Sequence, residues 1–477
     1  MKLRLLLAGL GLAACAKNAE VLEPSSPATQ LAFEVEPGNA IVSEAVAPAV
    51  QVVIRASTGI NIKSATVPVT ISLSPNVTGA TLSGTTTVNA VGGFATFTDL
   101  SIDRAGADFQ LVARSGALTA ARSGRFNLRR RFTNVIVGAY HSCGITADGE
   151  VYCWGSNAYG QLGDGTTMDR LTPAILAGGL DFQARIALGF GHSCGLLLSG
   201  AAYCWGLNNY GQVGDGSATM RLLRVPVAGE LRFFALSLGN SHDCGISTLG
   251  GTYCWGNNFH GELGDGTVSP RSTQVAVSGG LTFSALSLGN SHSCGLTATG
   301  TAYCWGDNPM GQLGDGTTTQ RPSPVAVGGG LRFASLGTGG WHGCGLTAEG
   351  VAYCWGWNRD GQLGSGDTTS RASPVAVPGG LRFRTIVSGH SHSCALTAAG
   401  AAYCWGSNSL GQLGVRDKIS GPEVVTGGFT FASMSAGADH NCGVTTGGET
   451  LCWGSNFFGE LGDGATRNRF TPMRVAP

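Results

Sequence analysis

The chain has 477 residues, with 77 Gly, 15 Cys, and acidic and basic residues in equal number, 29 of each. Glycine at about twice its average usage has no three-residue period here, which excludes collagen, and 43% hydrophobic residues exclude a disordered polar chain. Zero net charge argues against a binder of nucleic acid or anionic membrane, which needs a positive field. The composition indicates many short strands joined by tight turns, and the odd cysteine count gives one cysteine a separate role.

Residues 1–15 (MKLRLLLAGLGLAAC) have a basic start and an apolar run shorter than the ~20 residues that span a bilayer, which predicts a signal peptide. The segment Leu12-Ala13-Ala14-Cys15 resembles the bacterial lipobox. That resemblance implies acylation of Cys15 and, with Ala16 following, an outer-membrane lipoprotein that is periplasmic or surface-exposed. The alternative is an ordinary secretory signal cut nearby. Either signal takes the chain out of the reducing cytosol, so the other 14 cysteines are free to pair.

Residues 16–30 are polar with two prolines, and we expect a flexible tether. Residues 31–128 contain alternating apolar runs, such as 50–54 and 67–71, separated by turn residues at the spacing of a β-sandwich without cysteine. The phrase LAFEVEPGNA, an expected strand at 84–88 and the phrase GGFATFTDLSIDRAGADFQLVA resemble bacterial immunoglobulin-like (Ig-like) domains. The resemblance implies a spacer, and no catalytic motif stands out in this segment.

From residue 132 to 477 the sequence repeats seven times at a period of 48 to 51 residues. Each repeat contains G-x-x-H-x-C, then C-W-G, then G-(Q/E)-(L/V)-G, and most repeats continue with D-G and a Pro-Val-type strand. Seven copies of a four-stranded unit of this length indicate a β-propeller. The phrases resemble the regulator of chromosome condensation repeat, also called the alpha-tubulin suppressor repeat. The fold that we expect is all-β: a seven-bladed β-propeller preceded by an Ig-like β-sandwich.

The two cysteines of every repeat lie ten residues apart, and hairpin geometry brings them together. If Thr146 faces Glu150, a three-residue loop ending in Gly149 remains, and Cys143 faces Cys153. Directly opposed residues have their Cβ atoms within disulfide range. We therefore predict seven disulfides: Cys143–Cys153, Cys194–Cys204, Cys244–Cys254, Cys294–Cys304, Cys344–Cys354, Cys394–Cys404 and Cys442–Cys452. Zinc thiolate binding is the alternative, disfavoured because each repeat offers one isolated pair.

Other repeated residues favour structural roles. The seven histidines of G-x-x-H are too far apart for shared metal binding, and we expect each to hydrogen-bond backbone; we expect no metal and no cofactor. Each Trp of C-W-G and each Leu of G-(Q/E)-L-G is expected to pack between blades. An Arg stands six residues after the Asp of D-G in five repeats. This Asp–Arg pair is expected to brace a loop rather than to bind an anion.

Positions that differ among the seven copies are those that packing does not dictate, so they are candidate partner-binding residues. The position before the Gly of G-(Q/E)-(L/V)-G is variable, and the fifth repeat adds two tryptophans and a nearby arginine. The candidates are Tyr159, Tyr210, His260, Met310, Trp341, Trp357, Arg359, Asp360, Leu410 and Phe458. Local loop packing is the alternative role for these residues.

Relatives of this repeat family include a chromatin-bound guanine-nucleotide exchange factor, a plant ultraviolet-B photoreceptor and a secreted inhibitor of beta-lactamases. The signal peptide and uniform repeat lengths disfavour exchange, and the photoreceptor's G-W-R-H-T phrase has one partial echo, at residues 340–342. We expect a monomeric, non-enzymatic binding protein of the cell envelope that recognises another protein or a surface glycan. The alternative is an extracytoplasmic hydrolase, disfavoured because catalysis needs an asymmetric constellation and no catalytic residue stands out.

Overall fold

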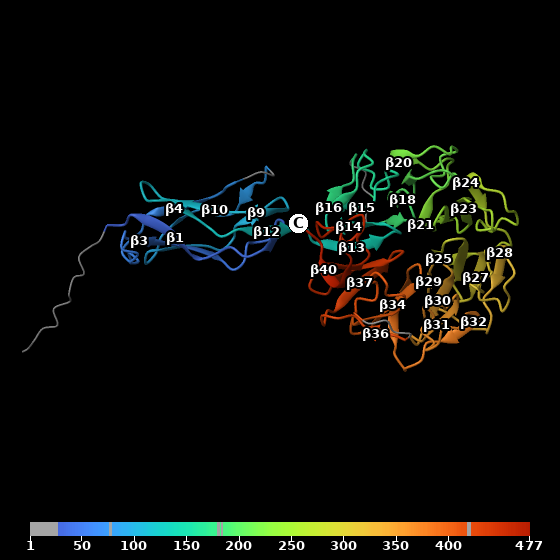
Figure 1. Cartoon of the computed structure of the whole chain (residues 1–477). Coiled ribbons are helices and arrows are strands. Elements are labelled where there is room, and N and C mark those ends of the chain that lie inside the picture. The colour runs from blue at the N-terminus through green and yellow to red at the C-terminus, as the bar shows by residue number, and fades with distance from the viewer. Residues whose placement is uncertain (1–26, 76–78, 179–181, 183–184, 417–420) are drawn as a thin grey trace, which may run out of the picture. The chain divides into compact units, whose positions relative to one another are not determined.

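The structure is a computed structural model that describes residues 27–75, 79–178, 182, 185–416 and 421–477. The expected signal peptide, Cys15 and the first part of the tether lie outside the described residues. The chain divides into two compact units, residues 1–129 and 130–477, and the described elements of both are β-strands (Figure 1). Within the described ranges, no helix has the length and apolar character needed to cross a bilayer.

The strands of the first unit pair into small sheets with the orders β1-β3-β7, β11-β10-β4-β6, β2-β12-β9 and β5-β8. Their bounds are β1 (Gln30–Val35), β2 (Ala40–Ile41), β3 (Val50–Arg55), β4 (Pro68–Leu73), β5 (Leu82–Ser83), β6 (Thr87–Asn89), β7 (Phe94–Phe97), β8 (Ser101–Ile102), β9 (Gly106–Phe109), β10 (Leu111–Arg114), β11 (Ala121–Arg122) and β12 (Phe126–Arg129). These strands enclose one apolar core, in which Val52, Ile71 and Phe97 are buried.

The alternating run at 50–54 lies in β3, and that at 67–71 lies in β4 apart from its first residue, so these strand predictions are confirmed. The strand predicted over 84–88 is wrong, because only its last two residues belong to a strand, β6. Gly84 has a φ of 95°, and a Cβ there would lie 2.3 Å from the carbonyl oxygen of Asp99. The Asp99 side chain accepts hydrogen bonds from the N–H and hydroxyl of Thr85. The backbone therefore turns at this point instead of continuing as a strand.

The second unit contains seven four-stranded antiparallel sheets, each made of four strands consecutive in sequence. The sheets are β13 (Phe132–Val137), β14 (His141–Thr146), β15 (Val151–Gly155), β16 (Arg170–Ile175); β17 (Ile186–Leu188), β18 (His192–Leu196), β19 (Ala202–Gly206), β20 (Arg221–Pro226); β21 (Phe233–Leu238), β22 (His242–Ser247), β23 (Thr252–Gly256), β24 (Arg271–Ala276); β25 (Phe283–Leu288), β26 (His292–Thr297), β27 (Ala302–Gly306), β28 (Arg321–Ala326); β29 (Ser335–Thr338), β30 (His342–Leu346), β31 (Ala352–Gly356), β32 (Arg371–Ala376); β33 (Phe383–Ser388), β34 (His392–Thr397), β35 (Ala402–Gly406), β36 (Glu423–Val424); and β37 (Phe431–Ala436), β38 (His440–Thr445), β39 (Thr450–Gly454), β40 (Arg469–Arg474).

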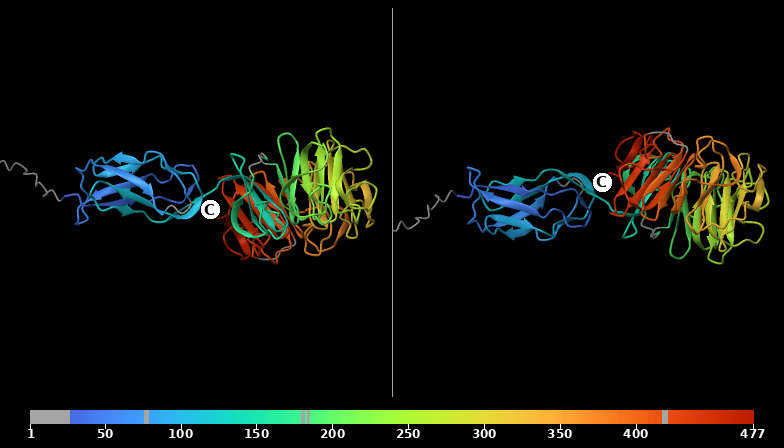
Figure 2. Two further views of the ribbon diagram at one scale, coloured as in Figure 1. Left: turned by 90° about the horizontal axis from the view of Figure 1, so that it is seen from above. Right: turned by 90° about the horizontal axis from the view of Figure 1, so that it is seen from below.

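These sheets stand around a common centre like the blades of a propeller, which Figure 1 shows face-on and Figure 2 from two further sides. The first strand of each sheet contacts the first strand of the next, and β13 contacts β37, so the innermost strands close a ring. No strand is exchanged between the sheets that contain the two ends of this unit, as far as the described residues extend. Side chains make the closure instead: the Trp154 indole N–H donates to the Glu460 carbonyl oxygen at 2.8 Å.

The tryptophan of every C-W-G phrase is fully buried between sheets. Trp205 packs with Cys143, Cys153 and Leu162 of the preceding repeat, and the other repeats follow this pattern. Each indole N–H donates to the backbone carbonyl of the Gln or Glu in G-(Q/E)-(L/V)-G of the preceding repeat, at 2.8–3.1 Å. The predicted packing of Trp and Leu between blades is confirmed.

Each predicted cysteine pair is disulfide-bonded, with Cα atoms 4.0–4.1 Å apart. The register is the one that hairpin geometry predicts: Cys143 faces Cys153, and the Thr146 N–H donates to the Glu150 carbonyl. The last residue of the loop, Gly149, has a φ of 86°, in the left-handed region that favours glycine. All seven bridges are buried and tie the second strand of each sheet to the third.

Candidate functional site

Two sets of loops emerge at the same end of the sheets. In an antiparallel four-stranded sheet, the turn from strand 1 to strand 2 and the turn from strand 3 to strand 4 lie at one end, and the 2–3 hairpin lies at the other. The 1–2 turn holds the residues between Gly and His of G-x-x-H, and the long 3–4 loop holds G-(Q/E)-(L/V)-G. We call this end the long-loop face, and the end with the 2–3 hairpins the hairpin face.

A buried asparagine that sequence reasoning missed organises each long loop. In the fourth repeat, the Asn308 amide donates to the carbonyl oxygens of Thr317 and Thr319 at 3.1 and 3.0 Å, and the Asn308 side-chain oxygen accepts the Leu313 N–H at 3.0 Å. The equivalent residues are Asn157, Asn208, Asn258, Asn358, Asn408 and Asn456, all buried. Each asparagine therefore satisfies backbone groups from both ends of its loop and fixes the loop's path.

The predicted Asp–Arg pairs brace the same loops. Their N–O distances are 2.6 Å for Arg170–Asp164, 2.7 Å for Arg221–Asp215, 3.4 Å for Arg271–Asp265, 3.0 Å for Arg321–Asp315 and 2.5 Å for Arg469–Asp463. In the fifth repeat, where Ser365 replaces the aspartate, Arg371 pairs with Asp367 at 2.8 Å. Burial raises the pKa of Asp164, but bonds from Thr166, Arg170 and Asn157 outweigh it, and the pKa is lowered. The loop-bracing prediction is confirmed.

The candidate residue before each G-(Q/E)-(L/V)-G is held by one recurring bond: its backbone N–H donates to the side-chain oxygen of the buried Gln or Glu two residues later. The pairs are Tyr159–Gln161, Tyr210–Gln212, His260–Glu262, Met310–Gln312, Asp360–Gln362, Leu410–Gln412 and Phe458–Glu460, at 2.8–3.0 Å. We call the first members of these pairs the rim residues. Their backbones are fixed alike while their side chains differ, which is a rigid way to display variable groups.

The histidines of G-x-x-H lie inward of these loops, fully buried, and link neighbouring sheets. His141 Nε2 lies 2.8 Å from the Ser193 hydroxyl of the next repeat, and that hydroxyl donates to the Gln161 carbonyl. Because the serine donates its proton to a carbonyl, the histidine must carry its hydrogen on Nε2. The last junction follows the same rule, with His440 Nε2 2.9 Å from the Ser142 hydroxyl. The structural role is confirmed, but the expected backbone partner is wrong: the partner is a side chain on the neighbouring sheet.

Three junctions depart from the serine pattern. At one of them, His392 Nε2 lies 3.0 Å from the Asn441 side-chain oxygen. His192 meets Asp243 at 2.6 Å, and burial raises the pKa of that carboxyl group. Asp243 also lies near Cys194 and Cys204, but those sulfurs are bridged to each other and offer no thiolate to a metal. At the fifth repeat the partner position is Gly343, so neither ring nitrogen of His292 has a hydrogen-bond partner among the described residues. Among the described residues, the junction between the fourth and fifth repeats therefore lacks the bond from the histidine Nε2 to the next sheet.

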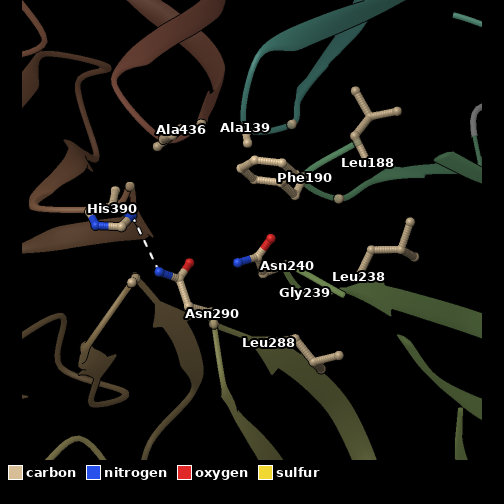
Figure 3. A pocket seen from close by; sticks show the side chains of 18 of the residues that line it. Ala139, Leu188, Phe190, Leu238, Gly239, Asn240, Leu288, Asn290, His390 and Ala436 are labelled. Carbon is tan, nitrogen blue, oxygen red and sulfur yellow. Dashed lines mark hydrogen bonds between the residues drawn. The ribbon is translucent and has the colours of Figure 1, made fainter. Parts of the chain in front are cut away.

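A pocket opens where the 1–2 turns meet at the centre of the long-loop face, with a volume of about 170 Å³. Its polar side chains include Asn240, Asn290 and His390, which Figure 3 shows together with the ring of Phe190. Tyr140 is a second aromatic residue of the lining. The Asn290 amide lies 3.4 Å from His390 Nδ1. Sequence comparison of the seven copies missed this set, although four of the five stand at the position after the Gly of G-x-x-H, which is also variable.

Three candidate residues reach the neighbourhood of this pocket. Phe458 contacts the pocket residue Tyr140, with ring centroids 5.8 Å apart. Trp341 packs against the pocket residue His390 at 4.9 Å and stacks on Trp357 at 5.3 Å.

The remaining candidates lie further out on the same loops. Tyr210 pairs with Phe259 at 5.8 Å, and His260 lies 3.8 Å from Asp307. Tyr159, Met310 and Arg359 are exposed, whereas Asp360 and Leu410 are half-buried. The candidates thus share one face without forming one continuous patch.

Comparison with known families decides the classification of this ring. Residues 224–477, more than half of the chain, match the RCC1-like domain. The chain belongs to the RCC1-like domain family. Residues 133–161 and 184–212, and separately 148–196, match regulator of chromosome condensation (RCC1) repeats, which extends the assignment to the first two repeats. The resemblance to this repeat family is therefore confirmed.

Similar solved structures agree on the RCC1-like propeller fold. Human WBSCR16 superposes with a TM-score of 0.63 at 23% identity, over 69% of this chain and 94% of that one. Prp20p of Saccharomyces cerevisiae gives a TM-score of 0.61 at 21% identity, over 69% and 86%. At these identities the likeness shows the fold alone.

Among curated proteins, the RCC1-like chain is 44% identical to human "Probable E3 ubiquitin-protein ligase HERC4" over 87 residues, 18% of this chain and 8% of that protein. It is 37% identical to the "Ultraviolet-B receptor UVR8" of Arabidopsis thaliana over 94 residues, 20% of this chain and 21% of the receptor. These matches span less than a quarter of either relative.

Proposed function

We propose that this protein is an exported, non-enzymatic binding protein whose RCC1-like propeller holds a partner, another protein or a surface glycan, on its long-loop face. One observation carries the proposal. In every repeat, the backbone N–H of the rim residue donates to the buried Gln or Glu two residues later. The rim side chains themselves differ: Tyr, Tyr, His, Met, Asp, Leu and Phe. A constant frame with variable displayed groups is the arrangement that recognition requires.

The pocket chemistry supports binding. Carboxamides, an imidazole and aromatic rings converge at the centre of this face, and these groups orient a ligand through hydrogen bonds and apolar contact. The frame around them is rigid because disulfides and inter-sheet hydrogen bonds fix every sheet. A pre-organised surface loses little conformational entropy on binding, which favours affinity.

Export is supported by the cysteine chemistry. Seven disulfides persist in oxidising compartments and are rare in the reducing cytosol, and residues 1–15 have the pattern of a lipoprotein signal. We propose a lipid anchor on Cys15 in the outer membrane and a monomeric chain. Metabolic labelling with palmitate tests the anchor: the label is expected in the native chain and absent from Cys15→Ser, and equal labelling of both would contradict it.

Two finer structural assignments belong to the same proposal. We propose that the RCC1-like ring is a complete seven-bladed propeller, because bonds such as Trp154 to Glu460 and Ser142 to His440 join the last repeat to the first. We also propose that residues 31–128 form an Ig-like sandwich acting as a spacer, since their strands enclose one apolar core without a disulfide. A crystal structure of the full chain would test both.

Site-specific photocrosslinking tests the binding face. A photoreactive phenylalanine analogue is introduced at Tyr210 or Phe458, which are 42% and 40% exposed on the long-loop face. The matched controls are Leu198 and Leu249, which are 65% and 94% exposed on the hairpin face. In cells of the source organism, we expect adducts from the first pair and none from the second. Adducts from both faces alike, or from neither, would count against the proposed face.

A further inference from the structure

The central pocket has two chemically different sides. Ala139, Phe190 and Ala438, from the first, second and seventh repeats, provide apolar surface. Asn240, Asn290 and His390, from the third, fourth and sixth repeats, provide amide and imidazole groups. Figure 3 shows the Phe190 ring and the Asn240 amide both directed toward the middle of the pocket. A ligand that fills this pocket must therefore be apolar on one side and polar on the other.

The polar side has unused hydrogen-bonding capacity. Among the residues that the structure describes, none hydrogen-bonds the Asn240 side chain, which offers two donors and an acceptor. The Asn290 amide makes one long contact, 3.4 Å to His390 Nδ1. The edge-on packing of Trp341 against His390 supports the orientation of the imidazole. Three hydrogen-bonding groups thus stand in an arc, with only one weak contact between them.

The charge of the lining residues and the volume of the pocket further restrict the class of ligand. The residues that line the pocket include no Asp, Glu, Lys or Arg, so no permanently charged side chain of opposite sign would compensate a charged group for its lost hydration. The volume of about 170 Å³ is smaller than the roughly 300 Å³ at which pockets for drug-sized molecules begin. The occupant is therefore one small neutral unit, with any larger part of the ligand lying outside over the rim residues.

We propose that this pocket binds a single neutral sugar ring, the end unit of a glycan. A pyranose carries hydroxyl groups around its edge, which match an arc of separate donors and acceptors, and it has an apolar C–H surface that packs on an aromatic ring such as Phe190. A neutral amino-acid side chain carries one polar group at its tip and would leave most of the arc unused. This inference rests on the proposed binding face and selects the glycan over a protein partner.

The test is titration of the full chain, purified in detergent, with the methyl glycosides of glucose, galactose, mannose and N-acetylglucosamine, followed by saturation-transfer NMR and calorimetry. We expect at least one glycoside to bind at millimolar concentration. Asn240→Ala and Asn290→Ala are each expected to weaken it about tenfold, the effect of one lost hydrogen bond. Asn209→Ala is the matched control, because Asn209 is exposed on a long loop and does not line the pocket.

The outcomes separate this inference from the proposed function. Absence of binding by all four glycosides, or equal binding by the native chain and Asn240→Ala, would overturn the sugar pocket. If the glycosides fail to bind but photocrosslinking at Tyr210 and Phe458 in cells still yields protein adducts, the proposed binding face stands and its partner is a protein. Thermal denaturation of each variant keeps the test valid, since Asn240→Ala removes no internal hydrogen bond and is expected to melt like the native chain.

Discussion

Two regions of each repeat differ in how far the seven copies agree. The buried frame, made of the disulfide, the histidine, the tryptophan and the loop asparagine, is nearly identical in every copy and makes the bonds within and between sheets. The rim residues differ in almost every copy and lie exposed or half-buried on one face. The boundary is sharp: in each long loop the constant Gln or Glu and the variable rim residue stand two positions apart.

This contrast separates residues that stabilise the fold of a repeat protein from residues that are free to serve binding. Each sheet must pack against its neighbours, so the same geometry selects the same frame residue in all seven repeats. A rim side chain faces solvent or a partner, so the frame places little constraint on it. Substitutions in the frame should therefore change stability, and substitutions on the rim should change binding while leaving stability nearly constant.

Acid is expected to have the largest effect, because it acts on the frame histidines together. Burial lowers the pKa of His141, His242, His342 and His440 to about 3. A pKa depressed in the folded state leaves stability intact above the unfolded pKa of ~6.5 and removes about 1.4 kcal/mol per histidine for each pH unit below it. Burial raises the pKa values of Asp243, Glu262 and Glu460, which offsets part of the loss.

Hydrogen exchange followed by mass spectrometry measures this acid response region by region. Between about pH 6 and about pH 4, residues 130–477 are expected to lose protection. Residues 27–129 contain no histidine, so they are the internal control and should keep their protection. Equal protection of 130–477 at both pH values would show that the buried histidines do not limit stability.

Removal of one disulfide is expected to have the next largest effect. The double variant Cys344→Ala/Cys354→Ala frees a ten-residue loop, and in the chain-entropy model this lowers the free energy of unfolding by about 3 kcal/mol. Equilibrium urea denaturation measures the change. Cys15→Ser is the matched control, expected to unfold like the native chain because it touches no bridge, and an unchanged urea midpoint for the double variant would contradict the prediction.

Within one long loop, the buried asparagine is expected to contribute more to the free energy of unfolding than the ion pair does. Asn308→Ala removes a buried side chain, leaves backbone groups of Leu313, Thr317 and Thr319 without this partner, and should cost about 2 kcal/mol. Arg321→Ala removes a partly exposed ion pair and should cost less than about 1 kcal/mol. Thermal denaturation of both variants compares them, and a larger effect of the arginine would reverse this order.

The junction whose histidine makes no side-chain bond, between the fourth and fifth repeats, provides a smaller comparison inside the frame. His242→Leu breaks the bond to Ser293 and leaves that hydroxyl one partner fewer, whereas His292→Leu removes a ring that hydrogen-bonds no described residue. The two changes alter packing alike, so His242→Leu should cost about 1–2 kcal/mol more. Matched urea denaturation measures the difference, and equal costs would mean that the Nε2 bonds contribute little to closing the ring.

Local geometry made most of the frame predictable from sequence. The Cys143–Cys153 pairing followed from a three-residue hairpin loop that ends in glycine, and the Asp164–Arg170 pair followed from the spacing within one loop. The bond from His141 to Ser193 was not predictable, because it joins residues 52 positions apart on different sheets. The pocket was missed for the same reason: Phe190, Asn240 and His390 meet only when the ring closes.

The smallest expected effect on stability comes from a rim residue beside its own frame partner. Met310 is 36% exposed, and its backbone N–H donates to the side chain of Gln312, which is fully buried. Met310→Ala keeps that bond and should change the free energy of unfolding by no more than about 0.5 kcal/mol. Gln312→Ala removes a buried side chain, leaves the Met310 N–H without its partner, and should cost about 1–3 kcal/mol. Urea denaturation of both variants tests the contrast two residues apart. If Met310→Ala destabilised the chain as much as Gln312→Ala, the rim side chains would belong to the frame, and their variation among the copies would reflect local packing instead of recognition.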